Sequence, residues 1–227
     1  MKPIFFLLGM VGTIFASQGF TQGLEAVRYV AVGDSYTIGT GASLVESWPA
    51  VLTRHLQSAG IQIDLVANLA IAGKTAQNVL QEQLPVFQRL HPSFATLLIG
   101  ANDCVQGVDI NIFAQRLTIV MDRLLSILPG RDRLVILTIP DFSITPRGLV
   151  WSADQNLAGK IRAYNRVIVQ AAAARGLAVI DLYDVSRGMK DDSSLVSRDG
   201  LHPSAKEYAV WEKLIYPKVF QILQKNF

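Results

Sequence analysis

Five mostly apolar runs recur along the chain, and between them apolar residues recur at every third or fourth position. The runs are Val27–Val32, Ile63–Ala67, Phe94–Ile99, Leu134–Ile139 and Leu177–Leu182. Continuous apolar runs of this length are typical of strands buried on both faces, whereas the wider spacing is typical of helices with one buried face. The alternation predicts βαβ units, and hence an α/β fold with a parallel sheet covered by helices on both sides.

Caps, glycines and prolines set the expected helix limits. The pattern predicts helices at Ser47 to about Ala59, Thr75 to Leu84, about Asp109 to Leu128, Asp154 to Arg175, and from near Ser204 onward. Pro85 is expected to break or bend the second helix, and Pro217 to kink or divide the last one. The segment Pro140–Ala153 mixes apolar and polar residues, and we interpret it as a long loop that packs on the body or covers a site.

The first 26 of the 227 residues resemble a signal peptide. Lys2 precedes an apolar run, Pro3–Phe15, that is short for a bilayer span, and Ser17 and Gly19 are small residues suited to cleavage. We therefore expect an exported protein, periplasmic or secreted, with residues 27–227 forming one domain. An uncleaved N-terminal membrane anchor remains the alternative.

Charge and composition exclude some classes of partner. The net charge is only +3, and the basic residues form no stripe, so nucleic acid is not expected as a partner. His55, His91 and His202 are far apart in sequence, and Cys104 is the single cysteine, so no metal-ligand spacing is present. We expect neither a metal nor an organic cofactor.

Candidate functional residues follow four of the five apolar runs. Ser35 follows the first, Gly73 the second and Asn102 the third, while Asp199 and His202 come after the fifth. In parallel sheets ligands bind beyond the carboxyl ends of the strands, so these residues are expected at one edge. They offer a nucleophile, a base, a carboxylate to orient the base and an amide donor for an oxyanion. Each is also compatible with a cap or turn.

Two other motifs suggest different chemistry. Gly73-Lys74-Thr75 between a strand and a helix resembles part of a P-loop, but Asn68 stands where that motif requires glycine. Cys104 lies beside the Asn102 motif, but no histidine is near it in sequence, and a lone cysteine is typically a small buried residue. We interpret neither as a functional site.

Four blocks together resemble the SGNH hydrolases, also called the GDSL lipase/esterase family. The blocks are Gly33-Asp34-Ser35, Gly73, Gly100-Ala101-Asn102-Asp103, and Asp199-Gly200-Leu201-His202-Pro203, in the family's order. Trp48-Pro49 is similar to the exported bacterial thioesterase and lysophospholipase-like arylesterase branch. Tyr36 replaces the leucine of the name motif, which affects the shape of the pocket.

The resemblance implies a role for each matching residue. Ser35 would be the nucleophile, His202 the base and Asp199 its partner. The oxyanion hole would consist of the Ser35 and Gly73 backbone N–H groups and the Asn102 side chain. The implied fold is a flavodoxin-like three-layer α/β/α arrangement of five strands in the order 2-1-3-4-5.

The resulting hypothesis is a serine esterase that hydrolyses ester or thioester bonds through an acyl-enzyme. We expect small acyl substrates that are lipid-like or of medium length, with contact to lipid substrates, because Ile144, Leu149 and Trp151 of Pro140–Ala153 could wall an acyl pocket. Two alternatives stay open. One is a carbohydrate O-acetyl esterase or acetyltransferase of the same family, and the other is a non-enzymatic binding module.

Overall fold

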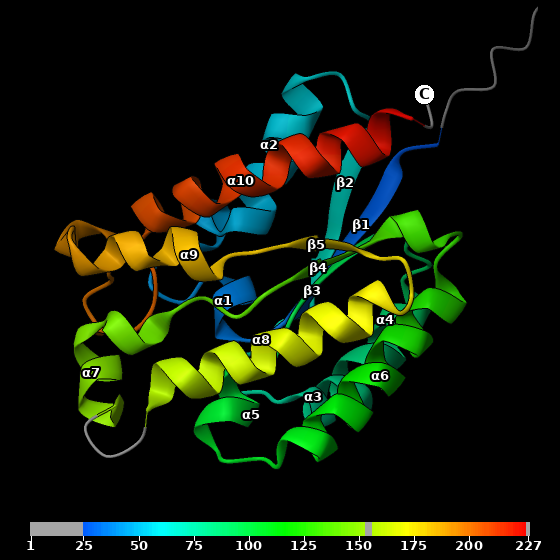
Figure 1. Ribbon diagram of the computed structural model, residues 1–227. Coiled ribbons are helices and arrows are strands. Elements are labelled where there is room, and N and C mark those ends of the chain that lie inside the picture. The colour runs from blue at the N-terminus through cyan, green and yellow to red at the C-terminus, as the bar shows by residue number, and fades with distance from the viewer. Residues whose placement is uncertain (1–24, 153–155, 226–227) are drawn as a thin grey trace, which may run out of the picture.

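The computed structural model describes residues 25–152 and 156–225, and within them five parallel strands form one sheet (Figure 1). The strands are β1 Val27–Gly33, β2 Ile63–Asn68, β3 Phe94–Leu98, β4 Leu134–Leu137 and β5 Ala178–Ile180. They pair in the order β2-β1-β3-β4-β5. This arrangement confirms the predicted α/β fold class and strand order.

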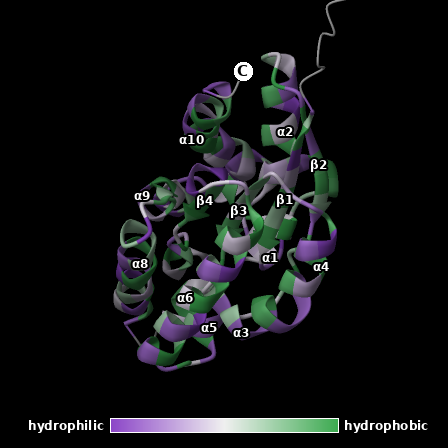
Figure 2. Cartoon of the chain, turned by 90° about the vertical axis from the view of Figure 1, so that its right-hand side faces the viewer, coloured by the Kyte–Doolittle hydropathy of each residue, from purple (hydrophilic) through white to green (hydrophobic). Residues whose placement is uncertain are grey.

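Helices cover both faces of the sheet. They are α1 Ser35–Ile38, α2 Trp48–Ser58, α3 Ala76–Asn78, α4 Leu84–Arg89, α5 Ala101–Val105, α6 Ile110–Ile127, α7 Pro146–Ser152, α8 Leu157–Ala173, α9 Tyr183–Ser186 and α10 Ala205–Gln224. Helices α2 and α10 pack together on one face, and α4, α6 and α8 lie on the other (Figure 1). Figure 2 shows the strands between these layers mostly in the hydrophobic colour.

Burial explains the composition of the strands. Every residue of β3 and β4 is buried, and in β1 only Arg28 is exposed, because these central strands have helices on both sides. The edge strands β2 and β5 are partly open. Tyr29 of β1 and Thr96 of β3 are fully buried, and their hydroxyl oxygens lie 2.7 Å apart in a hydrogen bond. This bond satisfies two polar groups that could not otherwise reach water.

The two prolines affect their helices differently. The helical segment continues past Pro85 to Arg89, because a π-helical turn at Val79–Gln83 precedes Pro85 and a new helix begins at Leu84. There the missing N–H of proline costs nothing. Pro217 does not divide α10. It lies on the exposed side of that helix, where water can replace the hydrogen bond that the proline removes.

The Pro140–Ala153 segment contains regular structure where the sequence predicts a long loop that packs on the body or covers a site. Its first part forms a 3₁₀ turn at Phe142–Ile144, and its second part forms helix α7. The expected signal peptide, residues 1–26, lies almost wholly outside the described residues, as do Asp154 and Ala153. No helix in the described part of the chain is both long and apolar enough to cross a membrane.

The Tyr29–Thr96 bond yields a stability prediction. Tyr29→Phe removes one partner and leaves the Thr96 hydroxyl buried without it, so we expect unfolding in urea to become easier by about 1–3 kcal/mol. Thr96→Val added to Tyr29→Phe removes the orphaned group and should recover part of that loss. If the double variant loses as much stability as the sum of the two single variants, the bond makes no coupled contribution.

Candidate active site

The first strand carries Ser35 to the carboxyl edge of the sheet. Strand β1 ends at Gly33, and the Asp34 carboxylate accepts the Tyr36 N–H at 3.1 Å, which caps the short helix that Ser35 begins. A Cβ on Gly33 would overlap the carbonyl oxygen of Leu98, its partner in β3. Only glycine therefore allows β1 and β3 to approach this closely where the serine leaves the sheet.

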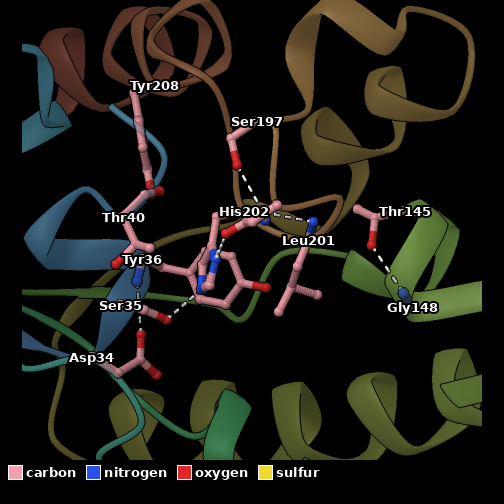
Figure 3. Close-up of polar contacts among 11 residues, drawn as sticks. Asp34, Ser35, Tyr36, Thr40, Thr145, Gly148, Ser197, Leu201, His202 and Tyr208 are labelled. Carbon is pink, nitrogen blue, oxygen red and sulfur yellow. Dashed lines mark hydrogen bonds and ion pairs between the residues drawn. The ribbon is translucent and has the colours of Figure 1, made fainter. Parts of the chain in front are cut away.

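His202 bridges Ser35 and Asp199. Its Nε2 lies 2.9 Å from Ser35 Oγ, and its Nδ1 lies 2.6 Å from Asp199 Oδ2 (Figure 3). The structure thus brings together three residues that the sequence separates by up to 167 positions. With Nδ1 donating to the carboxylate, Nε2 is the acceptor that faces the serine hydroxyl, which is the arrangement needed to remove its proton.

The turn from Asp199 to His202 holds the carboxylate in place. Asp199 Oδ1 accepts the Leu201 N–H at 2.8 Å, the His202 N–H at 3.0 Å and the Ser197 hydroxyl at 2.7 Å. Gly200 makes this turn possible with a φ of 73°. Partial burial raises the pKa of Asp199, but the hydrogen bonds from His202, Leu201 and Ser197 outweigh it and hold the pKa well below its usual range. Asp199 therefore stays ionised and orients the imidazole.

The Tyr36 ring packs against the His202 ring, a role that the sequence did not reveal. The centres of the Tyr36 and His202 rings lie 5.4 Å apart, and Tyr36 also stacks on Phe142 at 6.1 Å. The indole of Trp48 donates to the Tyr36 carbonyl at 3.1 Å. The departure from leucine at this position therefore gives the histidine an aromatic neighbour.

Three donors expected to form an oxyanion hole line one cavity. Ser35, Gly73 and Asn102 all border it. Within the described residues, the backbone N–H groups of Ser35 and Gly73 donate to no protein group, so both are available to a ligand. Asn102 Nδ2 donates to the Lys74 carbonyl at 3.0 Å and lies 3.4 Å from Asp34 Oδ2, which fixes the orientation of the amide. The arrangement can bind a negatively charged oxygen.

The cavity has a volume of about 180 Å³, and apolar groups make up much of its wall. Besides the polar residues and His202, it is lined by Tyr36, Ala72, Ala101, Val105, Phe142, Trp151 and Leu201. Of the three residues expected to wall an acyl pocket, Trp151 lines it, whereas Ile144 and Leu149 do not. Leu149 projects outward instead. Phe142 of the same apolar segment also lines the cavity, although it was not among the three expected wall residues; its aromatic side chain soon after the fourth strand is the signal for it.

A larger cavity of about 560 Å³ lies elsewhere, between α8, α9 and the ends of β4 and β5. None of the expected site residues borders it, so chemistry rather than size identifies the site around Ser35. In the described ranges, no group of three His, Cys, Asp or Glu side chains is placed to hold a metal ion.

The remaining sequence candidates have other surroundings. Cys104 is buried, and burial raises the pKa of its thiol to about 11, which disfavours the nucleophilic thiolate. Lys74 of the Gly-Lys-Thr motif forms an ion pair with Glu82 at 2.9 Å. His55 lies 3.0 Å from the buried Glu212, and His91 occupies a turn with a φ of 47°. None of these four borders the cavity around Ser35.

Buried acids adjoin the site. Asp34 is completely buried, and its burial, with a smaller contribution from the charge of Asp103, raises its pKa to about 7 despite hydrogen bonds from Tyr36 and Asn102. Asp103 Oδ2 accepts the Ala76 N–H at 2.9 Å, and its Oδ1 has no partner. These acids connect the loops that carry Ser35, Gly73 and Asn102.

Two sequence comparisons find proteins to which the chain is similar. The sequence model of the GDSL-like Lipase/Acylhydrolase family matches residues 31–210. The chain is 24% identical to the spore germination lipase LipC of Bacillus licheniformis over 209 residues, which cover 83% of this chain and 94% of that protein.

Solved structures share the fold. The crystal structure of TesA is similar with a TM-score of 0.71 and 20% identity, covering 86% of this chain and 99% of that one. The acetylxylan esterase Axe2 of Geobacillus stearothermophilus gives a TM-score of 0.69 and 17% identity, over 85% and 94% of the two chains.

The raised pKa of Asp34 yields a pH prediction. The folded pKa of about 7 exceeds the ordinary value of 3.8, so the folded state binds more protons between these values and loses stability as the pH rises through them. Asp34→Asn keeps the cap but cannot ionise. We expect it to raise the free energy of unfolding above pH 7 by about 1–3 kcal/mol relative to wild type, and to change it little near pH 4.

Chemical denaturation at several pH values measures this effect. Glu207 remains in the variant with a pKa that burial raises to about 7, so the pH slope should weaken without vanishing. An equal change in stability at both ends of the pH range would show that Asp34 is not the titrating group.

Proposed function

The chain belongs to the GDSL-like lipase/acylhydrolase family and is an ester-hydrolysing enzyme, and on that premise we propose that it cleaves medium-length acyl esters or thioesters through an acyl-enzyme on Ser35. The observation that carries the proposal is the continuous hydrogen-bonded path from Ser35 Oγ through the His202 ring to Asp199. A serine hydroxyl is a weak nucleophile until an adjacent base takes its proton, and this path supplies that base.

The reaction proceeds in two halves. Ser35 Oγ attacks the acyl carbon while His202 Nε2 takes its proton, and the carbonyl electron pair moves onto the oxygen. The tetrahedral intermediate collapses, the bond to the alcohol or thiol breaks, and His202 returns the proton to that leaving group. Water then attacks the acyl-enzyme with His202 again as base, which releases the acid and restores Ser35.

The hydrogen-bond donors around the cavity stabilise the negative oxygen of the tetrahedral intermediate. The Ser35 and Gly73 N–H groups have no other partner among the described residues, and the Asn102 amide lies at the same cavity. The negative oxygen of the intermediate would accept the two backbone N–H groups without reorganisation of the protein, which is the usual source of a large rate effect. The Asn102 amide would add a third donor by releasing the Lys74 carbonyl or Asp34 Oδ2, its present acceptors. Asp199 stabilises the imidazolium that forms at the same moment.

The apolar wall favours an aliphatic acyl group. Phe142, Trp151 and Leu201 line the cavity beside Ser35, and burying each CH₂ of a substrate against such a wall contributes about 0.8 kcal/mol. The volume of about 180 Å³ also favours a second candidate, a carbohydrate O-acetyl esterase, because an acetyl group would fit entirely inside. The dependence of rate on acyl length separates the two.

The nucleophile can be tested directly. Ser35→Ala should lower kcat for p-nitrophenyl butyrate by at least about 10³-fold, because no other group can form the acyl-enzyme. Covalent labelling by a fluorophosphonate should disappear with it, while circular dichroism stays unchanged. Ser58→Ala, which removes an exposed hydroxyl on α2, is the matched control and should keep full activity. Activity of Ser35→Ala within tenfold of wild type would remove Ser35 from the mechanism.

The acyl wall yields a second test. Trp151→Ala should lower kcat/KM for octanoyl esters by at least about tenfold more than for acetyl esters, because only the longer chain reaches the indole. The matched control is Leu149→Ala, which changes the neighbouring side chain outside the cavity and should leave that ratio unchanged for dissolved esters. An equal loss of kcat/KM on both esters would show that Trp151 has a structural role and does not contact the acyl chain. A wild-type preference for acetyl esters would favour the second candidate.

A further inference from the structure

Helix α7 is attached firmly beside the cavity. The Thr145 hydroxyl donates to the Phe142 carbonyl at 2.8 Å. It also accepts the Gly148 N–H at 3.1 Å (Figure 3). A Cβ on Gly148 would overlap the Phe142 carbonyl oxygen, so the helix packs on the 3₁₀ turn through its glycine. The Arg147 N–H also donates to the Gly200 carbonyl at 2.9 Å. These contacts tie α7 to both the cavity wall and the turn that carries His202.

This attachment leaves the apolar residues after Gly148 facing solvent. Leu149 is 60% exposed and Val150 is 72% exposed. Neither contributes to the hydrophobic core of the described residues. Water contact of this extent on adjacent apolar side chains is unfavourable, and clustered exposed apolar residues are typical of surfaces that bind something.

The exposed residues continue into the cavity. Trp151 of α7 and Val105 of α5 both line the cavity and remain 38% and 45% exposed. Ile71, which precedes the lining residue Ala72, is also exposed. We call these five residues, Ile71, Val105, Leu149, Val150 and Trp151, the mouth surface. Through Trp151, the exposed apolar surface of α7 therefore reaches the cavity that holds the nucleophile.

The position of the mouth surface determines what can cover it. A protein seated there would close the entrance through which an ester must reach Ser35. A lipid aggregate would do the opposite, because it delivers its own molecules to the entrance. The cavity of about 180 Å³ is also small beside the roughly 300–1,000 Å³ of typical ligand pockets, so much of a long acyl chain must lie outside it.

We propose that the mouth surface docks on the acyl-chain interface of aggregated amphiphilic esters, such as micelles or bilayers, with Leu149 and Val150 inserted among the chains. The proposal rests on the ester hydrolysis proposed above and adds the physical state of the substrate. Exposed Arg147 precedes Val150 by three residues, so both lie on the same side of α7, and Arg147 can reach the headgroup level as long cationic side chains do at such interfaces.

Sedimentation with vesicles of dioleoyl phosphatidylcholine tests the docking. All proteins carry Ser35→Ala, so that no lipid is consumed. Leu149→Ser/Val150→Ser should weaken vesicle binding by at least about tenfold, because two apolar side chains no longer leave water. Ile119→Ser/Leu214→Ser is the matched control. It changes two exposed apolar residues that border no part of the cavity, and it should bind like the parent.

Activity assays on the otherwise wild-type chain separate the two proposals. With Leu149→Ser/Val150→Ser, hydrolysis of octanoyl esters should fall at least about tenfold when the ester is presented in vesicles, and stay within about twofold on the dissolved ester. Hydrolysis of the dissolved ester without vesicle binding would overturn the docking and leave the proposed function standing. Vesicle binding without hydrolysis of any ester would support the docking and overturn the proposed function.

Two further outcomes would overturn the docking proposal. The first is a loss of vesicle binding in the control pair as large as in the α7 pair, which would mean that binding is not specific to the mouth surface. The second is a dimer in analytical ultracentrifugation that Leu149→Ser/Val150→Ser dissociates, while vesicles stay unbound. The mouth surface would then pair with a second copy of the chain.

Discussion

The burial of a parallel sheet on both faces is the constraint on which the site depends. Because helices cover both faces of β1, β3 and β4, nearly every position in these strands must be apolar, and reactive groups can begin only where a strand ends. Parallel strands place all their carboxyl ends at one edge. Ser35, Asn102 and His202 therefore meet there, although each belongs to a different segment of the chain.

The same burial makes negative charge unfavourable on the two acids beside the nucleophile. Asp34 has no contact with water, and Asp103 leaves one carboxylate oxygen without a partner. Their carboxylates accept hydrogen bonds from backbone N–H groups and from Asn102, and these bonds connect the three loops. Burial disfavours the charged form of both acids, which raises the pKa of each. Asp199 stands at the other extreme, because its turn supplies enough donors to keep it ionised. The two carboxylates therefore differ in charge state through their surroundings alone.

Sequence reasoning predicted the parallel sheet and the meeting of Ser35, Gly73, Asn102, Asp199 and His202 at one edge, because strand periodicity and strand-end position are local properties. The strand order followed only from the family resemblance. It failed where tertiary packing determines the local structure of the backbone. The π-helical turn before Pro85 has no pattern of its own, and helix α7 depends on the close packing of Gly148 against the Phe142 carbonyl. The direction of a side chain on α7 depends on that packing. For this reason Trp151 was placed correctly at the cavity and its neighbour Leu149 was not.

The close packing of the sheet edge also determines where specificity can vary. A Cβ at Gly33 or Gly100 would overlap neighbouring atoms, so the strand ends leave no room for an acyl chain between them. Space for the substrate must come from the segments laid over the edge, here the 3₁₀ turn with Phe142, helix α7 with Trp151, and α5 with Val105. Phe142, Trp151 and Val105 thus lie on segments other than those that carry Ser35 and His202, whereas Tyr36 and Leu201 adjoin the catalytic residues in sequence. Changes in α7 can alter which acyl groups enter, or from what surface, without moving Ser35 or His202.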